Sequence, residues 1–489
     1  MRRSLLIYTL VIAVIGFGLY VTLEYGRRLA PPPNASGLLP RSDEAVARRA
    51  ATPSATSPGG GWTRSLREPL ARLLLQLIVI VLATRTVGAL FRRFKQPAVI
   101  GEMAAGIMLG PSLFGWAAPE LHQMVFPPDS FGALQLLSQI GVCLYLFVVG
   151  MDLDLDHLHR RAHTAVVVSH ASIVFPCFLG VLVSLWLYSK YAAAGVGFMP
   201  FALFMGIAMS ITAFPVLARI LEERGQAKTE LGTTAIACAA VDDVTAWILL
   251  AVIVAAVRAA GFASTAGTLL LVGGFIVTML VVVRPNLPTW LQLRQAGHDS
   301  PGQTAVARTL LLILASALAT EIIGIHALFG AFLAGVIMPA HPEFRRYLSV
   351  GVEQFSSVFL LPLFFACTGL RTEIGLLSEM GDWICCVGLI LVATAGKLGG
   401  SMVAAKLTGM GWRQAFSLGA LMNTRGLMEL IALNVGYDLG ILSPRIFAMM
   451  VLMALATTVM TGPLLGLAEA GAKRRRAPDF TSPSLFPER

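Results

Sequence analysis

Long apolar segments separated by short polar loops dominate this chain from residue 69 to residue 467. Most reach about 20 residues, the length that an α-helix needs to cross the hydrocarbon core of a bilayer. We predict about thirteen membrane-spanning helices from this pattern, and therefore an all-α polytopic membrane protein. The approximate centres of these helices are Ile80, Gly106, Val142, Pro176, Thr212, Asp242, Val277, Ile313, Ala331, Leu361, Thr394, Gly426 and Leu455.

The segments outside this apolar region have a different character. Residues 1–30 contain one more apolar run, and we favour an uncleaved membrane anchor over a cleaved signal segment. Residues 31–67 are rich in Pro, Ala, Ser, Gly and Arg, which predicts a disordered linker. The transmembrane domain is expected over residues 68–470, followed by a short basic cytoplasmic tail over residues 471–489.

Composition and charge support this organisation. The chain of 489 residues is 56% hydrophobic and 13% charged, whereas a soluble domain is about 25% charged. The net charge of +10 could indicate nucleic-acid binding, but the basic residues gather in alternate loops, which orients such proteins with those loops inside. We therefore expect no nucleic-acid partner. The basic loops contain Arg92, Arg93, Lys95, Arg160, Arg161, Arg224, Lys228, Arg284, Arg294, Arg345, Arg346, Lys406 and Arg413.

Two of the predicted spans are interrupted by polar or helix-breaking residues. The first interruption contains Ser210, Thr212 and Pro215, and the second contains Asn423, Thr424 and Gly426. Each is followed by a span with polar residues at its middle, Asp242 and Asp243 after the first and Thr457 and Thr458 after the second. Interrupted helices at corresponding positions of two halves indicate an inverted-repeat transporter. Its site lies where the half-helices meet, so these interruptions are expected to line it.

Asp242 and Asp243 lie in an otherwise uncharged run from Leu231 to Val257. One aspartate near a bilayer centre costs about 2.5–3.5 kcal/mol, so a functional reason is expected for two. Lys397 lies near the middle of another span and needs a counter-ion. Adjacent helical residues point about 100° apart, so one aspartate can pair with Lys397 while the other faces a cavity.

A second charged pair, Arg425 and Glu429, has the i,i+4 spacing of a helical ion pair. We expect it to be structural rather than part of the ion site. Other classes of function remain open as alternatives. A channel lacks a TVGYG-like filter here, and a metalloenzyme lacks an HExxH motif beside the aspartates. Only the small number of intramembrane polar residues argues against an organic-solute/proton transporter.

Six segments spread along the chain resemble the monovalent cation/proton antiporter-2 family of the sodium/proton exchanger-like superfamily. The resemblance is strongest to its cation/H⁺ exchanger branch. These segments are QPAVIGEMAAGIMLGPS (96–112), SITAFPVLARIL (210–221), VDDVTAW (241–247), GIHALFGAFLAG (324–335), LPLFFACTGL (361–370) and MNTRGLMELIALNVG (422–436). Many members of that branch have Asn-Asp where this chain has two aspartates, which leaves the proton stoichiometry open.

The resemblance implies two crossed, interrupted helices, a homodimer and an elevator-like alternation of the site across the bilayer. It marks Asp243 as the carboxylate that binds the cation or the proton, and Asp242 as the partner of Lys397. The expected function is exchange of Na⁺ or K⁺ for H⁺, without a cofactor and without a metal other than the transported cation. The expected location is a bacterial inner membrane, with the C-terminus in the cytoplasm.

Overall fold

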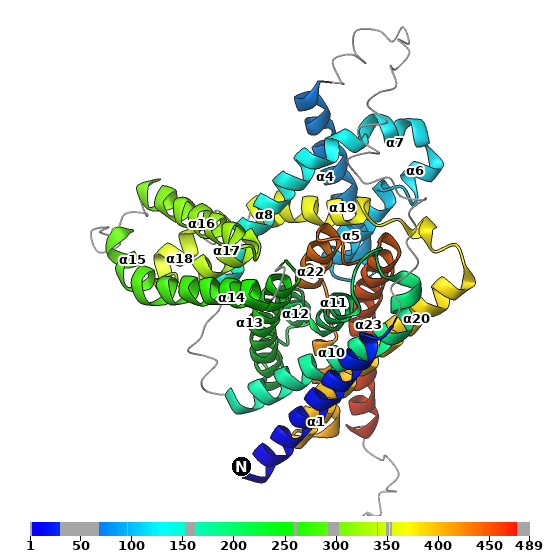
Figure 1. The fold of residues 1–489 in the computed structure, drawn as a ribbon, viewed down its shortest axis with the longest axis vertical. Helices are drawn as coiled ribbons and strands as arrows, with labels where there is room; N and C mark the ends of the chain where they lie inside the picture. The colour runs from blue at the N-terminus through cyan, green and yellow to red at the C-terminus, as the bar shows by residue number, and fades with distance from the viewer. Residues whose placement is uncertain are drawn as a thin grey trace, which may run out of the picture.

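A computed structural model of the chain describes residues 2–29, 68–94, 96–151, 162–258, 262–291, 303–339, 341–348, 352 and 355–476. Over these residues the fold is almost entirely helical (Figure 1). The predicted linker, residues 31–67, lies outside the described residues, as do Arg160 and Arg161 of one basic loop, Arg294 of another, and residues 477–489 of the predicted tail.

The predicted spans have counterparts among the described helices. Eleven of these helices are long and apolar enough to cross a membrane. The two remaining predicted centres fall on a short apolar helix, Ala327–Val336, and on a broken segment that joins Trp412–Met422 to Leu427–Asp438. Another short apolar stretch, Ala13–Gly26, belongs to the N-terminal helix. The prediction of an all-α polytopic membrane protein is thus confirmed.

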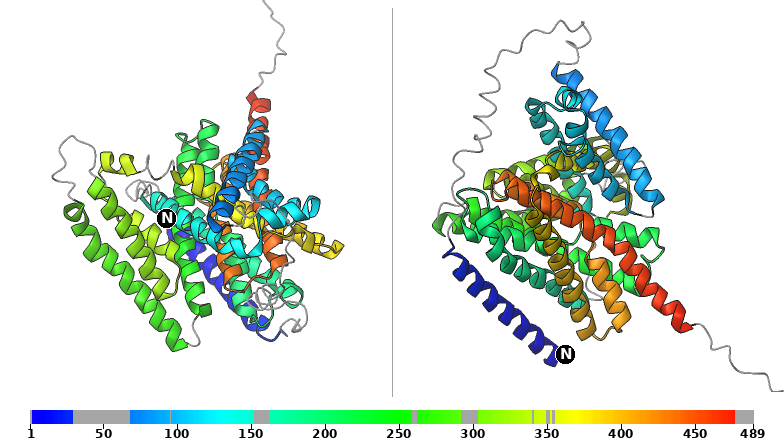
Figure 2. Two further views of the ribbon diagram at one scale, coloured as in Figure 1. Left: turned by 90° about the horizontal axis from the view of Figure 1, so that it is seen from above. Right: turned by 90° about the vertical axis from the view of Figure 1, so that its right-hand side faces the viewer.

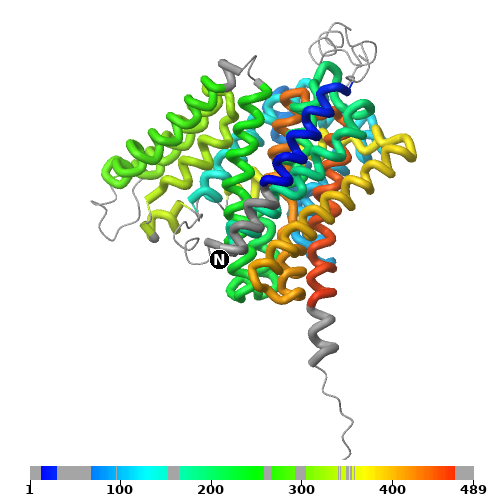
Figure 3. The backbone as a smooth tube through the Cα atoms, turned by 60° about the horizontal axis from the view of Figure 1, so that its bottom comes forward, coloured from blue at the N-terminus to red at the C-terminus, as the bar shows by residue number. Residues whose placement is uncertain are grey.

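One group of helices, which we call the crossed-helix body, comes from the middle and the end of the chain (Figure 1). Its helices are α10 (Ala162–Tyr191), α11 (Phe198–Ser210), α12 (Phe214–Glu223), α13 (Glu230–Arg258), α20 (Met380–Leu407), α21 (Trp412–Met422), α22 (Leu427–Asp438) and α23 (Pro444–Arg476). The N-terminal helix α1 (Arg2–Gly26) packs along α10, as Figure 3 also shows. The large hydrophobic core of the protein draws heavily on this body.

The remaining helices form a second group, the panel body, which extends into a separate lobe in two views (Figures 1 and 2). Its first part contains α4 (Pro69–Arg93), α5 (Ala98–Leu109), α6 (Phe114–Ala117), α7 (Pro119–Val125) and α8 (Phe131–Met151). Its second part contains α14 (Phe262–Val277), α15 (Arg284–Trp290), α16 (Gln303–Ile323), α17 (Ala327–Val336), α18 (Pro342–Leu348) and α19 (Leu361–Leu370). The bodies meet where α22 approaches α19 and α23 approaches α5.

The packing of the helices repeats between the two halves of the chain. Helix α4 packs on α5 as α16 packs on α17, and α5 packs on α19 as α17 packs on α8. In the crossed-helix body, α10 packs on α11 and α13 in the way that α20 packs on α21 and α23. This correspondence agrees with the repeat predicted from the two interrupted spans.

Glycines allow the close helix crossings of the panel body. At the crossing of α5 and α19, a Cβ built on Gly369 would lie 2.3 Å from the backbone of Gly106. At the matching crossing of α8 and α17, a Cβ on Gly335 would lie 2.1 Å from the carbonyl oxygen of Phe147. Small residues let membrane helices approach at backbone distance, and here they fix the panel helices to one another.

Candidate ion-binding site

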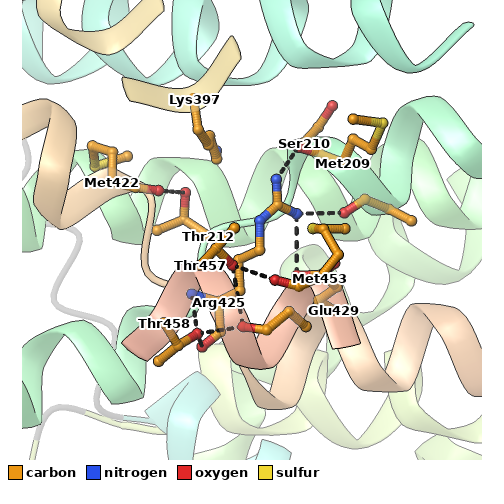
Figure 4. A network of polar contacts seen from close by, with 12 residues as sticks. Met209, Ser210, Thr212, Lys397, Met422, Arg425, Glu429, Met453, Thr457 and Thr458 are labelled. Carbon is orange, nitrogen blue, oxygen red and sulfur yellow. Dashed lines mark hydrogen bonds and ion pairs between the residues drawn. The ribbon is translucent and has the colours of Figure 1, made fainter. Parts of the chain in front are cut away.

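The two broken helices cross at their interruptions. Helix α11 ends at Ser210, and α12 begins with Phe214 and Pro215, where proline removes no helical hydrogen bond. The backbone N–H of Ala213 donates to the carbonyl of Thr424 over 3.0 Å. The hydroxyl of Thr212 donates to the carbonyl of Met422 over 3.2 Å (Figure 4). Each break thus supplies hydrogen-bond partners for the other, which buried backbone groups require.

Asp242 lies beside this crossing, on α13, and its carboxylate is saturated with donors. Oδ1 accepts a hydrogen bond from Ser169 (2.5 Å). Oδ2 accepts hydrogen bonds from Ser172 and Thr212, both at 2.6 Å. The Nζ atom of Lys397 lies 2.8 Å from the same oxygen, and both charged side chains are fully buried. Three hydroxyls and an ammonium therefore hold this carboxylate in place.

Lys397 projects from α20 towards the same polar cluster. Its Nζ also donates to the backbone carbonyl of Ser172 (2.9 Å) and to the Ser172 hydroxyl (3.2 Å). An ammonium offers three donors, and Asp242 together with Ser172 accounts for them. Lys397 thus ties α20 to α10 and α13 inside the crossed-helix body.

Asp243 has the opposite environment although it is the next residue. It is buried, and neither of its carboxylate oxygens has a hydrogen-bond partner of normal geometry. Its carboxylate lines a cavity of about 10 Å³, which has room for one water-sized particle. The other lining residues are Ile211, Ala246, Trp247, Leu250 and Met428. A buried carboxylate without a paired counter-charge is costly, so this cavity is suited to a particle that neutralises the charge.

The Arg425–Glu429 pair lies beside the same crossing (Figure 4). The ion pair has a distance of 3.1 Å, and both side chains are fully buried. The Arg425 guanidinium also donates to the carbonyls of Ala208 (2.9 Å) and Met209 (2.7 Å), at the C-terminal end of α11. Arginine thus caps one half-helix, while Glu429 lies in the first turn of α22, where the helix dipole favours a negative charge.

Three of the predicted lining residues make no hydrogen bond to the aspartates. The Ser210 hydroxyl donates to the carbonyls of Gly206 and Ile173. The Thr424 hydroxyl donates to that of Thr461 on α23. Asn423 is fully buried, and its side-chain amide has no hydrogen-bond partner. Among the predicted residues of the two breaks, only Thr212 binds a carboxylate of the pair.

Ser169 and Ser172 are site residues that the sequence analysis did not single out. They lie three residues apart on α10, which places them on one face of the helix, and both donate to Asp242. The signal available was a pair of polar residues at helical spacing within an apolar span. In the described part of the chain there is no group of three His, Cys, Asp or Glu residues that could hold a metal ion.

A larger cavity of about 680 Å³, which we call the vestibule, opens between the two bodies. Its acidic residues are Glu321 on α16 and Asp438 on α22. The vestibule also contains Gln135 of α8, whose Nε2 lies 3.5 Å from Oδ2 of Asp438. The vestibule is therefore lined by both bodies, and its Asp438 carboxylate is paired with Arg371 at 3.0 Å.

Comparison with known proteins gives a consistent result along most of the chain. Residues 78–468 match the family described as "Sodium/hydrogen exchanger, transmembrane". The Na(+)/H(+) antiporter NhaS4 of Synechocystis sp. is 44% identical over 398 residues, which cover 81% of this chain and 97% of that protein. Cation/H(+) antiporter 17 of Arabidopsis thaliana is 41% identical over 402 residues, 82% of this chain and 48% of its own.

More distant relatives share the same region. The K(+)/H(+) antiporter 1 of Saccharomyces cerevisiae is 32% identical over 407 residues. The chain spans about half the length of the yeast and plant proteins, with 46% of the former and 48% of the latter covered. The structure of the sodium proton antiporter MjNhaP1 from Methanocaldococcus jannaschii has the same fold. Its TM-score is 0.57 at 14% identity, and 83% of this chain and 99% of that one are covered.

Proposed function

Because the chain belongs to the sodium/hydrogen exchanger family, a family of membrane transporters rather than enzymes, we propose that it exchanges a monovalent cation, Na⁺ or K⁺, for protons. In this proposal the cation and the proton compete for Asp243. One observation carries the assignment: Asp243 is a buried carboxylate to which no side chain donates a hydrogen bond, and it lines a cavity for one small particle. Asp242 lacks this freedom because Lys397 and three hydroxyls occupy it.

The exchange follows from the cost of a buried charge. An empty Asp243 carries a negative charge in a water-poor cavity, which is unfavourable. Either a proton or a bare cation neutralises it, and a protonated carboxyl has lost the negative charge that would bind the cation, so the two compete. A neutralised site crosses the membrane more easily than a charged one, so movement of the cation in one direction is coupled to proton movement in the other.

The crossed-helix body is proposed to move relative to the panel body during this cycle. Supporting this, every hydrogen-bonded member of the Asp242 cluster belongs to the crossed-helix body, on α10, α11–α12, α13 and α20. The vestibule, in contrast, is lined by both bodies. A rigid displacement of the crossed-helix body would carry the ion site intact and would change the vestibule.

We also propose a homodimer in a bacterial inner membrane with a cytoplasmic C-terminus. The excess of Lys and Arg in alternate loops supports the orientation. The cyanobacterial relative supports a bacterial membrane. The homodimer rests on the resemblance to the antiporter family.

Exchange by purified protein in proteoliposomes tests the proposal. With an imposed proton gradient, Li⁺, Na⁺ or K⁺ outside should dissipate the gradient, and the Asp243→Asn variant should lose this activity. Asp129→Asn is the matched control, because Asp129 is an exposed carboxylate outside the cavity. Normal exchange by Asp243→Asn would refute the assignment of the site. Currents at single-channel rates from the parent protein would instead favour a channel.

A further inference from the structure

Trp247 is the large side chain that lines the Asp243 cavity on α13. It lies four residues after Asp243, so the two side chains share one face of the helix. Its indole Nε1 is buried without a hydrogen-bond partner, and the residue is 5% exposed. Apart from the Asp243 carboxylate, this N–H is the unpartnered side-chain polar group in the lining of that cavity. The site therefore offers one acceptor and one donor to a small occupant.

The same indole contacts the panel body. Its ring lies 5.0 Å from the ring of Phe329 at an interplanar angle of 83°, and it stacks on Phe332 at 6.1 Å and 27°. Both phenylalanines belong to α17, which is locked by close crossings to its neighbours. A Cβ on Gly330 would lie 2.0 Å from the carbonyl oxygen of Ser316. The wall behind Trp247 is thus rigid, since α17 has little room to shift.

The aromatic cluster formed by Trp247, Phe329 and Phe332 connects the wall of the ion cavity with α17, a helix that also lines the vestibule. Helix α17 contributes Ala327 to the vestibule and the two phenylalanines to the cluster. Helix α22 contributes Val435 to the vestibule and Met428 to the ion cavity. These two residues are seven positions apart on one face of α22, a rise of about 10 Å. A cation that moves from one cavity to the other must pass along the stretch of α22 between these two residues.

We propose that Trp247 determines cation specificity: its indole sets the size of the cation that Asp243 can hold and closes the site towards the vestibule. This inference rests on the proposed function and adds the residue that selects the ion. A cavity of about 10 Å³ admits a cation that has lost most of its water. A larger cation must displace the indole, which the rings of Phe329 and Phe332 resist. The site therefore selects its cation by the size that the Trp247 indole admits as well as by the charge of Asp243.

Exchange kinetics of Trp247 variants test this inference. In proteoliposomes, KM and Vmax are measured for Li⁺, Na⁺, K⁺ and Rb⁺ with the parent protein, Trp247→Leu and Trp247→Phe. We expect the ratio of KM for the largest to the smallest transported cation to fall about tenfold in Trp247→Leu. Trp247→Phe should change this ratio in the same direction by less. Trp186→Leu is the matched control, because Trp186 is 68% exposed on α10 and should keep the parent ratio.

The possible results separate the two proposals. A parent protein without exchange overturns the proposed function and this inference with it. A parent that exchanges, together with Trp247 variants that keep its KM ratios and lose only rate, overturns the inference alone and leaves Trp247 as a packing residue. If Trp247→Leu does not fold, Trp247→Phe and Met428→Ala, which opens the same cavity from α22, must both shift the ratio.

Discussion

At the residue scale, two neighbouring aspartates have opposite surroundings. Asp242 accepts three hydroxyl hydrogen bonds and pairs with Lys397, whereas neither oxygen of Asp243 has a hydrogen-bond partner of normal geometry. The reason is geometric, because side chains of adjacent helical residues point about 100° apart. One carboxylate therefore faces the serines of α10, while the other faces the small cavity. This division lets one aspartate stay fixed while its neighbour changes its occupant.

The first prediction concerns the buried ion pair. Lys397→Met leaves Asp242 fully buried without its counter-charge, and removal of one partner from such a pair costs about 3–5 kcal/mol. We expect a clear drop in the thermal unfolding temperature in detergent. The double variant Lys397→Met/Asp242→Asn removes both charges and should recover most of the loss.

The comparison of the single and the double variant is what tests the pairing. If the penalty comes from an uncompensated carboxylate, the double variant is more stable than Lys397→Met. Equal stability of the two would mean that Lys397 contributes by packing or by its bonds to Ser172. The exposed pair of Arg219 and Glu223 is a control: Arg219→Met should change stability by less than about 1 kcal/mol.

At the element scale, each broken helix supports the other. The carbonyls at the end of α11 accept hydrogen bonds from Arg425. The backbone N–H and carbonyl of Arg425 are bonded by the hydroxyl of Thr458 on α23 (Figure 4). Thr458 corresponds in the repeat to the aspartate pair of α13. The second half of the chain thus uses a neutral hydroxyl for structure where the first half uses carboxylates.

The second prediction concerns the crossing of α8 and α17. Replacement of glycine by alanine within a helix normally stabilises it by about 0.5–1 kcal/mol. At Gly335 the new Cβ would lie 2.1 Å from the carbonyl oxygen of Phe147, and such overpacking costs about 1–3 kcal/mol. Gly335→Ala should therefore lower the unfolding temperature. Gly388→Ala on α20, where a Cβ meets nothing within 4 Å, should leave it unchanged or raise it.

Comparison of Gly335→Ala with Gly388→Ala separates the cost of overpacking at the helix crossing from the gain in helix propensity. Similar unfolding temperatures for the two alanine variants would show that α8 and α17 can move apart cheaply. In that case the wall behind Trp247 would not be rigid. A selective loss in Gly335→Ala supports a panel body that behaves as one unit.

Features with a local physical cause could be predicted from the sequence. Pro215 and Gly426 indicate the two breaks, and the cost of buried charge indicates that Lys397 needs an acid, so the predicted contact with the aspartate pair follows. The partners of Asp242 on α10 could not be predicted, because tertiary packing sets the rotation of a helix about its axis. Ser210 was expected at the site, but a serine within a helix readily bonds the carbonyl four residues earlier, and here it does so.

At the scale of the whole molecule, the protein consists of two bodies with the ion site on one side of their boundary. The Asp242 cluster is held within the crossed-helix body, and the vestibule is shared with the panel body. The aromatic contact of Trp247 with Phe329 and Phe332 crosses the same boundary. Any movement of one body against the other must therefore break this contact and change the vestibule, which makes the boundary the place to test for motion.

The third prediction is that a link across the vestibule stops exchange. Gln135 of the panel body and Asp438 of the crossed-helix body approach to 3.5 Å between Nε2 and Oδ2. In the double variant Gln135→Cys/Asp438→Cys, a short bis-methanethiosulfonate reagent should join the bodies and abolish cation-dependent proton movement in proteoliposomes. A reductant should then restore it. Cys143 also lines the vestibule, so every variant in this experiment carries Cys143→Ser. The other native cysteines are buried or half-buried and should react slowly.

A link of the same length within one body provides the control. Arg72 and Asp129, both in the panel body, approach to 2.9 Å, and the variant Arg72→Cys/Asp129→Cys should keep its exchange after cross-linking. The single variants Gln135→Cys and Asp438→Cys, treated with the same reagent, show the effect of modification alone. Full exchange by a protein that is quantitatively linked across the vestibule would mean that the bodies need not move apart there. If only the protein linked across the vestibule loses exchange, and reduction restores that exchange, the boundary between the bodies must change in every cycle.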